Sequence, residues 1–265
     1  MSDLVDLRGR RALVTAASKG LGRAIAITLA RCGAHVAIGA RSEDALREVA
    51  AEIDGGGGGP TFFRAADLRV AHDIERLVEE SAVALGGLDV VVHNAGGPRP
   101  ARFTELTDED FADAFELVLM SNVRTIRAAL PHLQAAGGGA IVNVVGIGVK
   151  HALPNLVLGN AMRAGVVTLA KTLADELAPH GIRVNSVLPG SVLTDRVSSL
   201  IADGAHRAGI SFDESARRRA AEIPLGRLGR PEEVGSVVAF LASDAAAFVN
   251  GTAVSVDGGI VRSVV

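Results

Sequence analysis

Short apolar runs and longer amphipathic stretches alternate along the whole chain. The apolar runs are rich in Val, Ile and Ala and mostly continuous, as is typical of strands buried on both faces of a parallel sheet. They predict strands at residues 12–15, 35–39, 61–65, 89–93, 140–144, 183–188 and 253–256. Apolar positions at helical spacing predict helices at residues 21–31, 42–53, 72–85, 108–136, 160–179 and 231–243. This alternation predicts an α/β fold with one doubly wound sheet and helices on both of its faces.

One segment departs from this alternation. Residues 194–223 form a long irregular insertion after the sixth predicted strand, with a helix-forming stretch at 213–222. Long loops beyond the carboxyl ends of parallel strands commonly cover a substrate. The glycine tract at residues 55–59 lies between a helix and a strand and predicts only a flexible connection. We therefore expect one domain over residues 1–265, with residues 194–223 covering the substrate.

Composition narrows the functional classes. Hydrophobic residues make up 48% of the chain, which has eight Phe but no Trp or Tyr, so the core is aliphatic. A formal net charge of −3 gives no electrostatic attraction to nucleic acid or to an anionic membrane. The densest basic run, Arg217 to Arg219, is flanked by Glu214 and Glu222, which favours a solvated helix face.

The remaining compositional features concern location and metals. The single cysteine excludes an internal disulfide, and no cysteine spacing indicates a metal site. No run reaches the roughly 18–20 apolar residues of a membrane span, and residues 1–15 contain no secretory signal pattern. We therefore expect a cytoplasmic protein.

A glycine-containing turn, TAASKGLG at residues 15–22, directly follows the first strand and opens a helix. Glycines there let the backbone approach a pyrophosphate, and the helix N-terminus supplies free N–H groups and partial positive charge. The turn therefore indicates a dinucleotide-binding (Rossmann) domain. An NAD site would place an acid at the end of the second strand, but Arg41 stands there. Because Arg41 and Lys19 suit a ribose 2′-phosphate, NADP(H) is the predicted cofactor; the alternative is that both are surface cations.

Further motifs follow in order along nearly the whole chain. They are ADL at residues 66–68, HNAG at 93–96, SNV at 121–123, Pro189 and Gly190 with Thr194, and VDGG at 256–259. With these motifs the chain resembles the short-chain dehydrogenase/reductase family, and in particular its 3-oxoacyl-acyl-carrier-protein reductase-like members. The resemblance implies a seven-stranded parallel sheet, a homodimer or homotetramer built on the long helices, and hydride transfer between a nicotinamide and a small-molecule substrate.

The resemblance also implies cofactor-binding roles for individual positions. The phosphates would contact Ser18, Lys19 and Leu21, with Gly20 and Gly22. The adenine would be flanked by Asp67 and Leu68, and the ribose would lie along Asn94 and Gly96. The carboxamide would be held by Pro189, Gly190 and Thr194. Two positions depart from the family pattern, because Ala16 replaces the first glycine of the turn and His93 replaces the usual asparagine. The Ala16 methyl could push the pyrophosphate outward, whereas we interpret His93 as a structural residue.

The catalytic positions depart further. The family uses a Tyr-x-x-x-Lys pair, a Ser thirteen residues before the Tyr, and an Asn on the preceding long helix. Alignment over residues 142–165 places Gly146 at the Ser position, Gly159 at the Tyr position and Arg163 at the Lys position. Only the Asn, Asn122, is kept, and the chain contains no tyrosine that another alignment could supply.

The proton for a reduction must then have another source. Lys150 and His151 follow the fifth predicted strand and are either candidates for the acid or plain loop cations. Arg163 keeps its proton, so it could only hold the ribose hydroxyls or an anionic group. Arg99 and Arg102 lie near the expected substrate mouth, and we interpret them as surface residues.

The leading hypothesis is an atypical NADP(H)-dependent oxidoreductase that reduces a carbonyl or imine-like substrate without a Tyr general acid. Losing general-acid assistance costs roughly 10²–10⁴-fold in rate, whereas positioning donor and acceptor supplies about 7–11 kcal/mol, so an activated acceptor could still be reduced. One alternative is a catalytically silent nucleotide-binding partner or redox sensor. Another is a non-redox enzyme, although the halide-releasing members of the family keep the Ser and Tyr that are missing here.

Overall fold

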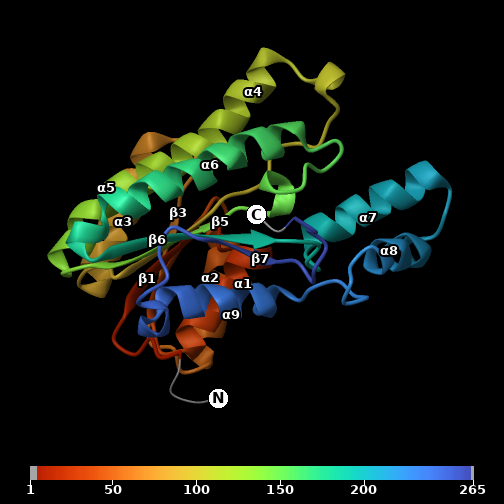
Figure 1. The fold of residues 1–265 in the computed structure, drawn as a ribbon. Coiled ribbons are helices and arrows are strands. Elements are labelled where there is room, and N and C mark those ends of the chain that lie inside the picture. The colour runs from red at the N-terminus through yellow and green to blue at the C-terminus, as the bar shows by residue number, and fades with distance from the viewer. Residues whose placement is uncertain (1–4, 264–265) are drawn as a thin grey trace.

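One sheet of seven parallel strands organises the computed structural model, which describes residues 5–263 (Figure 1). The strands are β1 (Arg11–Thr15), β2 (His35–Ala40), β3 (Phe62–Ala65), β4 (Val90–Asn94), β5 (Gly139–Val144), β6 (Ile182–Pro189) and β7 (Ala253–Val256). Their order across the sheet is β3-β2-β1-β4-β5-β6-β7, and every neighbouring pair is parallel. The predicted doubly wound α/β fold is confirmed, and each strand begins and ends within one residue of its prediction.

Helices cover both faces of this sheet (Figure 1). They are α1 (Gly20–Arg31), α2 (Glu43–Gly55), α3 (Ala71–Leu85), α4 (Asp108–Ala114), α5 (Ser121–Ala135), α6 (Val157–Glu176), α7 (Asp195–Ala208), α8 (Phe212–Ala221) and α9 (Pro231–Ala242). Helices α1, α2 and α9 pack on one face, and α3, α5 and α6 pack on the other. Within residues 5–263, no helix has the length and apolar character needed to cross a membrane.

The continuous apolar character of the strands follows from this double coverage. Along β4, Val90 and Val92 belong to the core beneath α1 and α9, whereas Val91 belongs to the core beneath α3 and α5. Successive side chains of a strand point to opposite faces, so a strand that is covered on both faces needs an apolar residue at every position.

Residues 108–136, predicted as one helix, are instead two helices joined by a π-helical segment, Phe115–Met120. The hydroxyl of Ser121 donates a hydrogen bond of 2.6 Å to the carbonyl of Leu117, four residues earlier. Such a bond competes with the α-helical backbone bond to the same carbonyl, and π-helical insertions are frequent near functional sites. The apolar spacing continues through the segment, so the pattern does not reveal the interruption.

Residues 194–223 are also more regular than predicted. They contain α7 and α8, which project beyond the carboxyl ends of the strands (Figure 1). The side chains of Thr194 and Ser211 accept backbone N–H bonds at the starts of these helices, and Gly209 ends α7 in the left-handed conformation. These are ordinary start and stop signals, so the irregular insertion of the prediction is an ordered helical pair.

Candidate active site

The carboxyl ends of β1 and β4 meet where the strand order reverses. The hydroxyl of Thr15 donates to the carbonyl of Asn94 at 2.7 Å and accepts from the Asn94 N–H at 3.0 Å. The side-chain amide of Asn94 donates to the carbonyl of Ala16 at 3.3 Å. Ligands of doubly wound sheets bind in the crevice at this reversal, so Asn94 holds the phosphate turn where a ligand would bind.

The turn between β1 and α1 has the backbone geometry of a phosphate cradle. Ala16 adopts a φ of 47°, in the left-handed region that glycine normally occupies. A Cβ at Gly22 would collide with the carbonyl oxygen of Ala16, so only glycine fits there. No side chain in the described part of the chain caps α1, which leaves N–H groups of its first turn for a ligand. A pyrophosphate fits this turn, and the Ala16 methyl does not prevent the turn from forming.

Asp67 and Arg41 lie near one another beyond this turn. Hydrogen bonds from Arg69 hold the pKa of the Asp67 carboxyl below its ordinary value, and the positive charge of Arg41 adds to the effect. Leu68 is buried below them. Arg41 and Lys19 are both exposed, and neither has an ion-pair partner among residues 5–263. The two cations are therefore available to an anionic group on a bound ribose.

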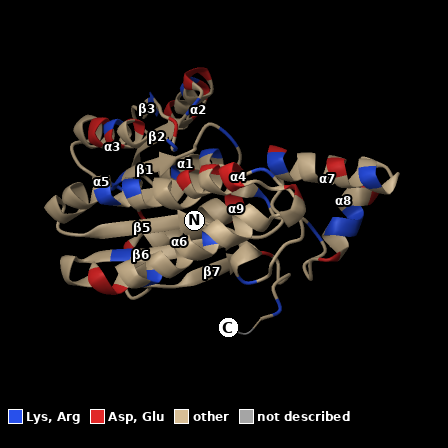
Figure 2. Cartoon of the chain, turned by 90° about the horizontal axis from the view of Figure 1, so that it is seen from above, with Lys and Arg blue, Asp and Glu red and all other residues tan. Residues whose placement is uncertain are grey.

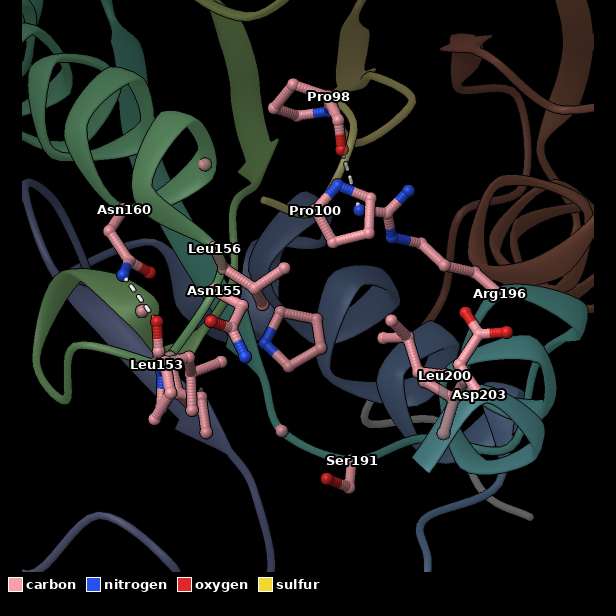
Figure 3. A pocket seen from close by; sticks show the side chains of 18 of the residues that line it. Pro98, Pro100, Leu153, Asn155, Leu156, Asn160, Ser191, Arg196, Leu200 and Asp203 are labelled. Atoms are coloured by element: carbon pink, nitrogen blue, oxygen red, sulfur yellow. Dashed lines mark hydrogen bonds between the residues drawn. The ribbon is translucent and has the colours of Figure 1, made fainter. Parts of the chain in front are cut away.

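A cavity of about 920 Å³ lies at the carboxyl ends of β5 and β6, bordered by α7 and α8 (Figure 3). Five predicted cofactor residues line it, namely Leu21, Arg163, Pro189, Gly190 and Thr194. The others lie outside the lining, around the phosphate turn and the ends of β2, β3 and β4: Ser18, Lys19, Gly20, Gly22, Arg41, Asp67, Leu68, Asn94 and Gly96. A Cβ at Gly20 would lie 3.7 Å from Cγ2 of Thr194, so the phosphate turn adjoins the cavity. The volume is in the range of small-molecule sites.

The positions aligned with Ser, Tyr and Lys meet in this cavity. Nη1 of Arg163 lies 3.4 Å from the place of a Cβ at Gly146 and 3.9 Å from that of a Cβ at Gly159. Gly146 has a φ of 133°, which serine rarely adopts, so the turn suits glycine. Burial lowers the pKa of Arg163 to about 10, with a smaller effect from the charge of Arg196. The guanidinium is therefore protonated at neutral pH and occupies the space beside two missing side chains.

Asn122 lies behind the cavity rather than in its lining. It is fully buried at the start of α5, and its Nδ2 donates to Oδ1 of Asn143 at 2.7 Å. Oδ1 of Asn122 has no hydrogen-bond partner within the described residues. Asn122, the one catalytic residue that the resemblance keeps, therefore does not border the space where a substrate would bind. Nearby, Nε2 of His93 lies 3.0 Å from Oγ of Ser121, and burial lowers the pKa of His93 to about 4, consistent with a structural role.

Lys150 and His151, the predicted acid candidates, do not reach the cavity. Both are exposed, and neither belongs to the lining. Their backbone N–H groups each donate to the carbonyl of Ile147 at 2.9 Å, which closes a tight turn at the end of the segment Ile147–Val149. This turn carries both side chains to the surface, which favours the alternative that they are plain loop cations.

Several arginines of the lining come from outside the predicted catalytic motif. Arg196, near the start of α7, donates to the carbonyl of Pro98 at 2.9 Å across the rim, as Figure 3 shows. Arg99 and Arg102 also line the cavity, and Arg99 is ion-paired to Asp110 at 2.8 Å. The sequence pattern drew attention to Arg99 and Arg102 but not to Arg196, because nothing local relates α7 to the loop after β4.

The basic run on α8 is only partly a solvated face. Arg217 and Arg218 pair with Glu214 at 2.9 Å each, as expected for exposed helical neighbours. Arg219 turns toward the cavity instead, and its Nε donates to Oγ of Ser191 at 3.0 Å. Only the packing of α8 beside the loop after β6 distinguishes Arg219 from its neighbours.

Known proteins share this architecture. A family model described as Enoyl-(Acyl carrier protein) reductase matches residues 15–261. A 3-oxoacyl-acyl-carrier-protein reductase of Thermotoga maritima is 34% identical over 258 residues, which is 96% of this chain and 99% of that protein. The chain belongs to the short-chain dehydrogenase/reductase family.

Two further comparisons relate this short-chain dehydrogenase/reductase to oxidoreductases. An uncharacterized oxidoreductase of Methylorubrum extorquens is 36% identical over 254 residues, 96% of this chain and 98% of that protein. L-sorbose reductase from Gluconobacter frateurii, solved with NADPH and L-sorbose, has a TM-score of 0.94 and 31% identity, over 99% of this chain and 100% of that one. The chain is thus an enzyme of the oxidoreductase class, and its phosphate turn and cavity fit a nicotinamide dinucleotide.

Proposed function

We propose that this enzyme is an NADP(H)-dependent reductase of a carbonyl or imine-like small molecule that works without a tyrosine acid. The observation that carries the proposal is the position of Arg163. Its guanidinium lies beside Gly146 and Gly159 in the cavity that also contains Pro189 and Gly190. A fixed cation there can stabilise negative charge on a substrate oxygen, as oxyanion-stabilising groups do in other enzymes.

The proposed preference for NADP(H) over NAD(H) rests on charge at the end of β2. Arg41 follows this strand where an NAD site would hold an acid for the ribose 2′-hydroxyl, and Lys19 lies in the phosphate turn. Guanidinium groups bind phosphate with two parallel hydrogen bonds, which suits a 2′-phosphate. The structure of L-sorbose reductase with NADPH supports the same preference.

Residues of this chain would position the nicotinamide and stabilise the substrate oxygen during reduction. Bound NADPH would supply a hydride to the carbonyl carbon of the substrate. Pro189 and Gly190 would border the nicotinamide, and Arg163 would donate hydrogen bonds to the substrate oxygen as negative charge develops on it. Because Arg163 keeps its own proton, water entering the cavity would supply the proton that completes the alcohol. The products are then the alcohol, the oxidised cofactor and hydroxide, which the buffer neutralises.

Magnitudes favour reduction of an activated acceptor. The missing tyrosine costs roughly 10²–10⁴-fold in rate. One well-placed donor to a developing oxyanion contributes about 10²–10³-fold, so Arg163 offsets much of this loss. Alcohol oxidation gains no such help, because it needs a base and an arginine cannot accept a proton.

Two steps test the proposal. Purified protein is titrated with NADPH, and the nicotinamide absorbance is then followed with a panel of ketones, quinones and imines. We expect NADPH binding and measurable oxidation, with Arg163→Gln lowering kcat/KM by about 10²–10³-fold. Lys150→Ala and His151→Ala, whose side chains are exposed outside the cavity, should change it little. Binding without oxidation by any acceptor would instead identify a silent nucleotide-binding protein, and no binding would reject both functions.

Arg41→Asp tests the cofactor assignment. The substitution removes a charge-assisted bond to the 2′-phosphate, so NADPH affinity should fall by about 10–100-fold while NADH affinity changes little. Arg31→Asp, which alters an exposed arginine at the other end of α1, is the matched control. Equal effects of Arg41→Asp on NADPH and NADH would contradict the assignment.

A further inference from the structure

Arginine predominates among the charged side chains of the cavity. Six arginines line it, Arg99, Arg102, Arg163, Arg196, Arg207 and Arg219, against three carboxylates, Glu105, Asp203 and Glu222. Helices α7 and α8, which carry both basic and acidic segments in Figure 2, supply half of these arginines. The whole chain carries a formal charge of −3, so the positive lining is a local feature that general composition does not explain. A positively charged cleft concentrates anionic ligands.

Arg163 lies beside Gly146 and Gly159 and has no counter-charge in the described part of the chain. Within residues 5–263, no carboxylate, carbonyl or hydroxyl accepts a hydrogen bond from its guanidinium. The side chain is partly buried, and burial lowers its pKa. A desolvated cation without an acceptor is unfavourable unless a ligand supplies the missing charge. The ribose hydroxyls of a cofactor could accept hydrogen bonds from this guanidinium, but they carry no negative charge to balance it.

Arg196 adds a second positive charge to the same space. Its Nη1 and Nη2 donate to the carbonyls of Gly97 and Pro98 at 3.2 and 2.9 Å, and it has no carboxylate partner in the described part of the chain. Its charge contributes to the lowered pKa of Arg163, so the two guanidiniums lie close enough to repel each other. An anion bound beside them would relieve this repulsion.

We propose that the substrate is a 2-oxo acid whose carboxylate binds Arg163, with Arg196 contributing to the positive field. The proposal rests on the proposed reductase function, because the keto group of the 2-oxo acid is the carbonyl that the enzyme would reduce. A planar guanidinium matches a planar carboxylate through two parallel hydrogen bonds. Its five N–H donors also leave one for a carbonyl oxygen on the adjacent carbon. One residue can thus hold the carboxylate and stabilise the oxygen that is reduced.

The rest of the lining suits an organic acid. Figure 3 shows Leu153 and Leu156 on one side of the cavity and Leu200 of α7 on the other. These apolar side chains would cover the carbon skeleton of the acid, while its carboxylate faces Arg163. Inorganic phosphate would satisfy the charge but would leave these apolar walls uncovered.

Ligand binding tests the carboxylate site without turnover. Protein saturated with NADP⁺ is titrated by calorimetry with oxamate, an unreactive analogue of a 2-oxo acid, and with oxamide, its neutral counterpart. We expect oxamate to bind at least about tenfold more tightly than oxamide, and Arg163→Gln to abolish this difference. Arg163→Lys keeps the charge but not the planar fork and should retain part of it. Arg127→Gln, an exposed arginine of α5 outside the cavity, should bind oxamate as the wild type does.

Several outcomes would overturn the proposal. They are no oxamate binding, equal affinity of the wild type for oxamate and oxamide, or unchanged oxamate affinity in Arg163→Gln. A loss of NADP⁺ affinity in Arg163→Gln as large as its loss of oxamate affinity would assign Arg163 to the cofactor instead. If Arg163→Gln does not fold, Arg163→Lys and the comparison of oxamate with oxamide still decide.

Kinetics separate this inference from the reductase function. NADPH oxidation is compared between phenylpyruvate and its methyl ester, which lacks the negative charge beside the carbonyl and carries one additional methyl group. A higher kcat/KM for the acid supports the inference. A higher value for the ester would overturn it while leaving the enzyme a reductase. If no acceptor of the panel is reduced, the reductase function fails, and oxamate binding remains the test of the carboxylate site.

Discussion

Ala16 occupies a position of the phosphate turn where the backbone adopts a φ of 47°. The left-handed conformation costs a residue with a Cβ roughly 1–2 kcal/mol. Ala16→Gly should therefore raise the free energy of unfolding by up to about 1 kcal/mol, because the greater freedom of glycine in the unfolded chain offsets part of the relief. Denaturant unfolding measures the change. Ala17→Gly, at the fully buried neighbour without a positive φ, should lower the same free energy, and a similar change in both variants would contradict the argument.

The sequence predicted which residues occupy the aligned catalytic positions better than it predicted where loop side chains point. The spacing of thirteen and four residues pointed to Gly146, Gly159 and Arg163, and the structure brings these three positions together in one cavity. The same sequence reasoning offered Lys150 and His151 as acids, but both are exposed on a tight turn. A fixed spacing on a helix determines which residues share a face, whereas the direction of a loop side chain depends on backbone bonds that no spacing reveals.

Among the secondary-structure elements, β6 is tied to the end of α9 by one side chain. The guanidinium of Arg183 donates to the carbonyls of Leu241 at 2.8 Å and Ser243 at 3.1 Å. The last carbonyls of a helix lack backbone partners and favour a nearby cation. Arg183→Met keeps much of the aliphatic stem but removes the donors, so we expect the free energy of unfolding to fall by about 2 kcal/mol.

An exposed arginine at the start of α9 provides the control for Arg183→Met. Arg230 lies 3.7 Å from Glu233 with a largely exposed side chain, so Arg230→Met should cost under about 1 kcal/mol. Urea unfolding of both variants gives the comparison. A loss in Arg183→Met no larger than that in Arg230→Met would show that the cation does not stabilise the helix end.

The sequence predicts the boundaries of strands and helices where they depend only on local features, such as apolar runs and capping residues. The apolar runs predict every strand, and Thr194 and Ser211 are capping residues that mark the starts of α7 and α8 within the segment predicted to be irregular. The π-helical segment Phe115–Met120 was not foreseen. Directly after this segment, the hydroxyl of Ser121 donates a hydrogen bond to the backbone carbonyl of Leu117. The apolar spacing is unbroken there, so hydrophobic periodicity does not reveal the π-helical segment.

For the molecule as a whole, acid stability should depend on His93. Burial lowers its pKa from 6.5 to about 4, so between these values the unfolded chain binds a proton that the folded chain does not. Stability is therefore complete above the unfolded pKa and falls as the pH drops toward 4, by as much as about 3 kcal/mol. Urea unfolding across this range should show a weaker pH dependence in His93→Asn. His35→Asn, at an exposed histidine, should keep the wild-type dependence; if both variants keep it, His93 is not the cause.

The assembly implied by the family resemblance is a second whole-molecule prediction. We expect a homodimer or homotetramer through the long helices, because α6 exposes the small side chains of Ala161, Ala164 and Thr168 on one face. Small side chains let a second helix approach closely, so Ala164→Arg should shift the assembly toward the monomer. Light scattering would give twice or four times the chain mass of 27.1 kDa for the wild type and for the control Ala51→Arg on α2. A wild-type mass of 27.1 kDa would contradict the prediction.

The sequence by itself determined the doubly wound sheet and the phosphate turn, and its spacing aligned Gly146, Gly159 and Arg163 with the family's Ser, Tyr and Lys. Each of these depends on periodicity or spacing within a short stretch of chain, such as the apolar runs or the order of residues 15–22. Only the tertiary structure decided which charges are free. Arg99 has a carboxylate partner, whereas Arg163 and Arg196 have none within residues 5–263. Ion pairing and burial depend on contacts between α6, α7 and the loop after β4, which are distant in sequence, and so no local pattern could show that two unpaired arginines share one cavity.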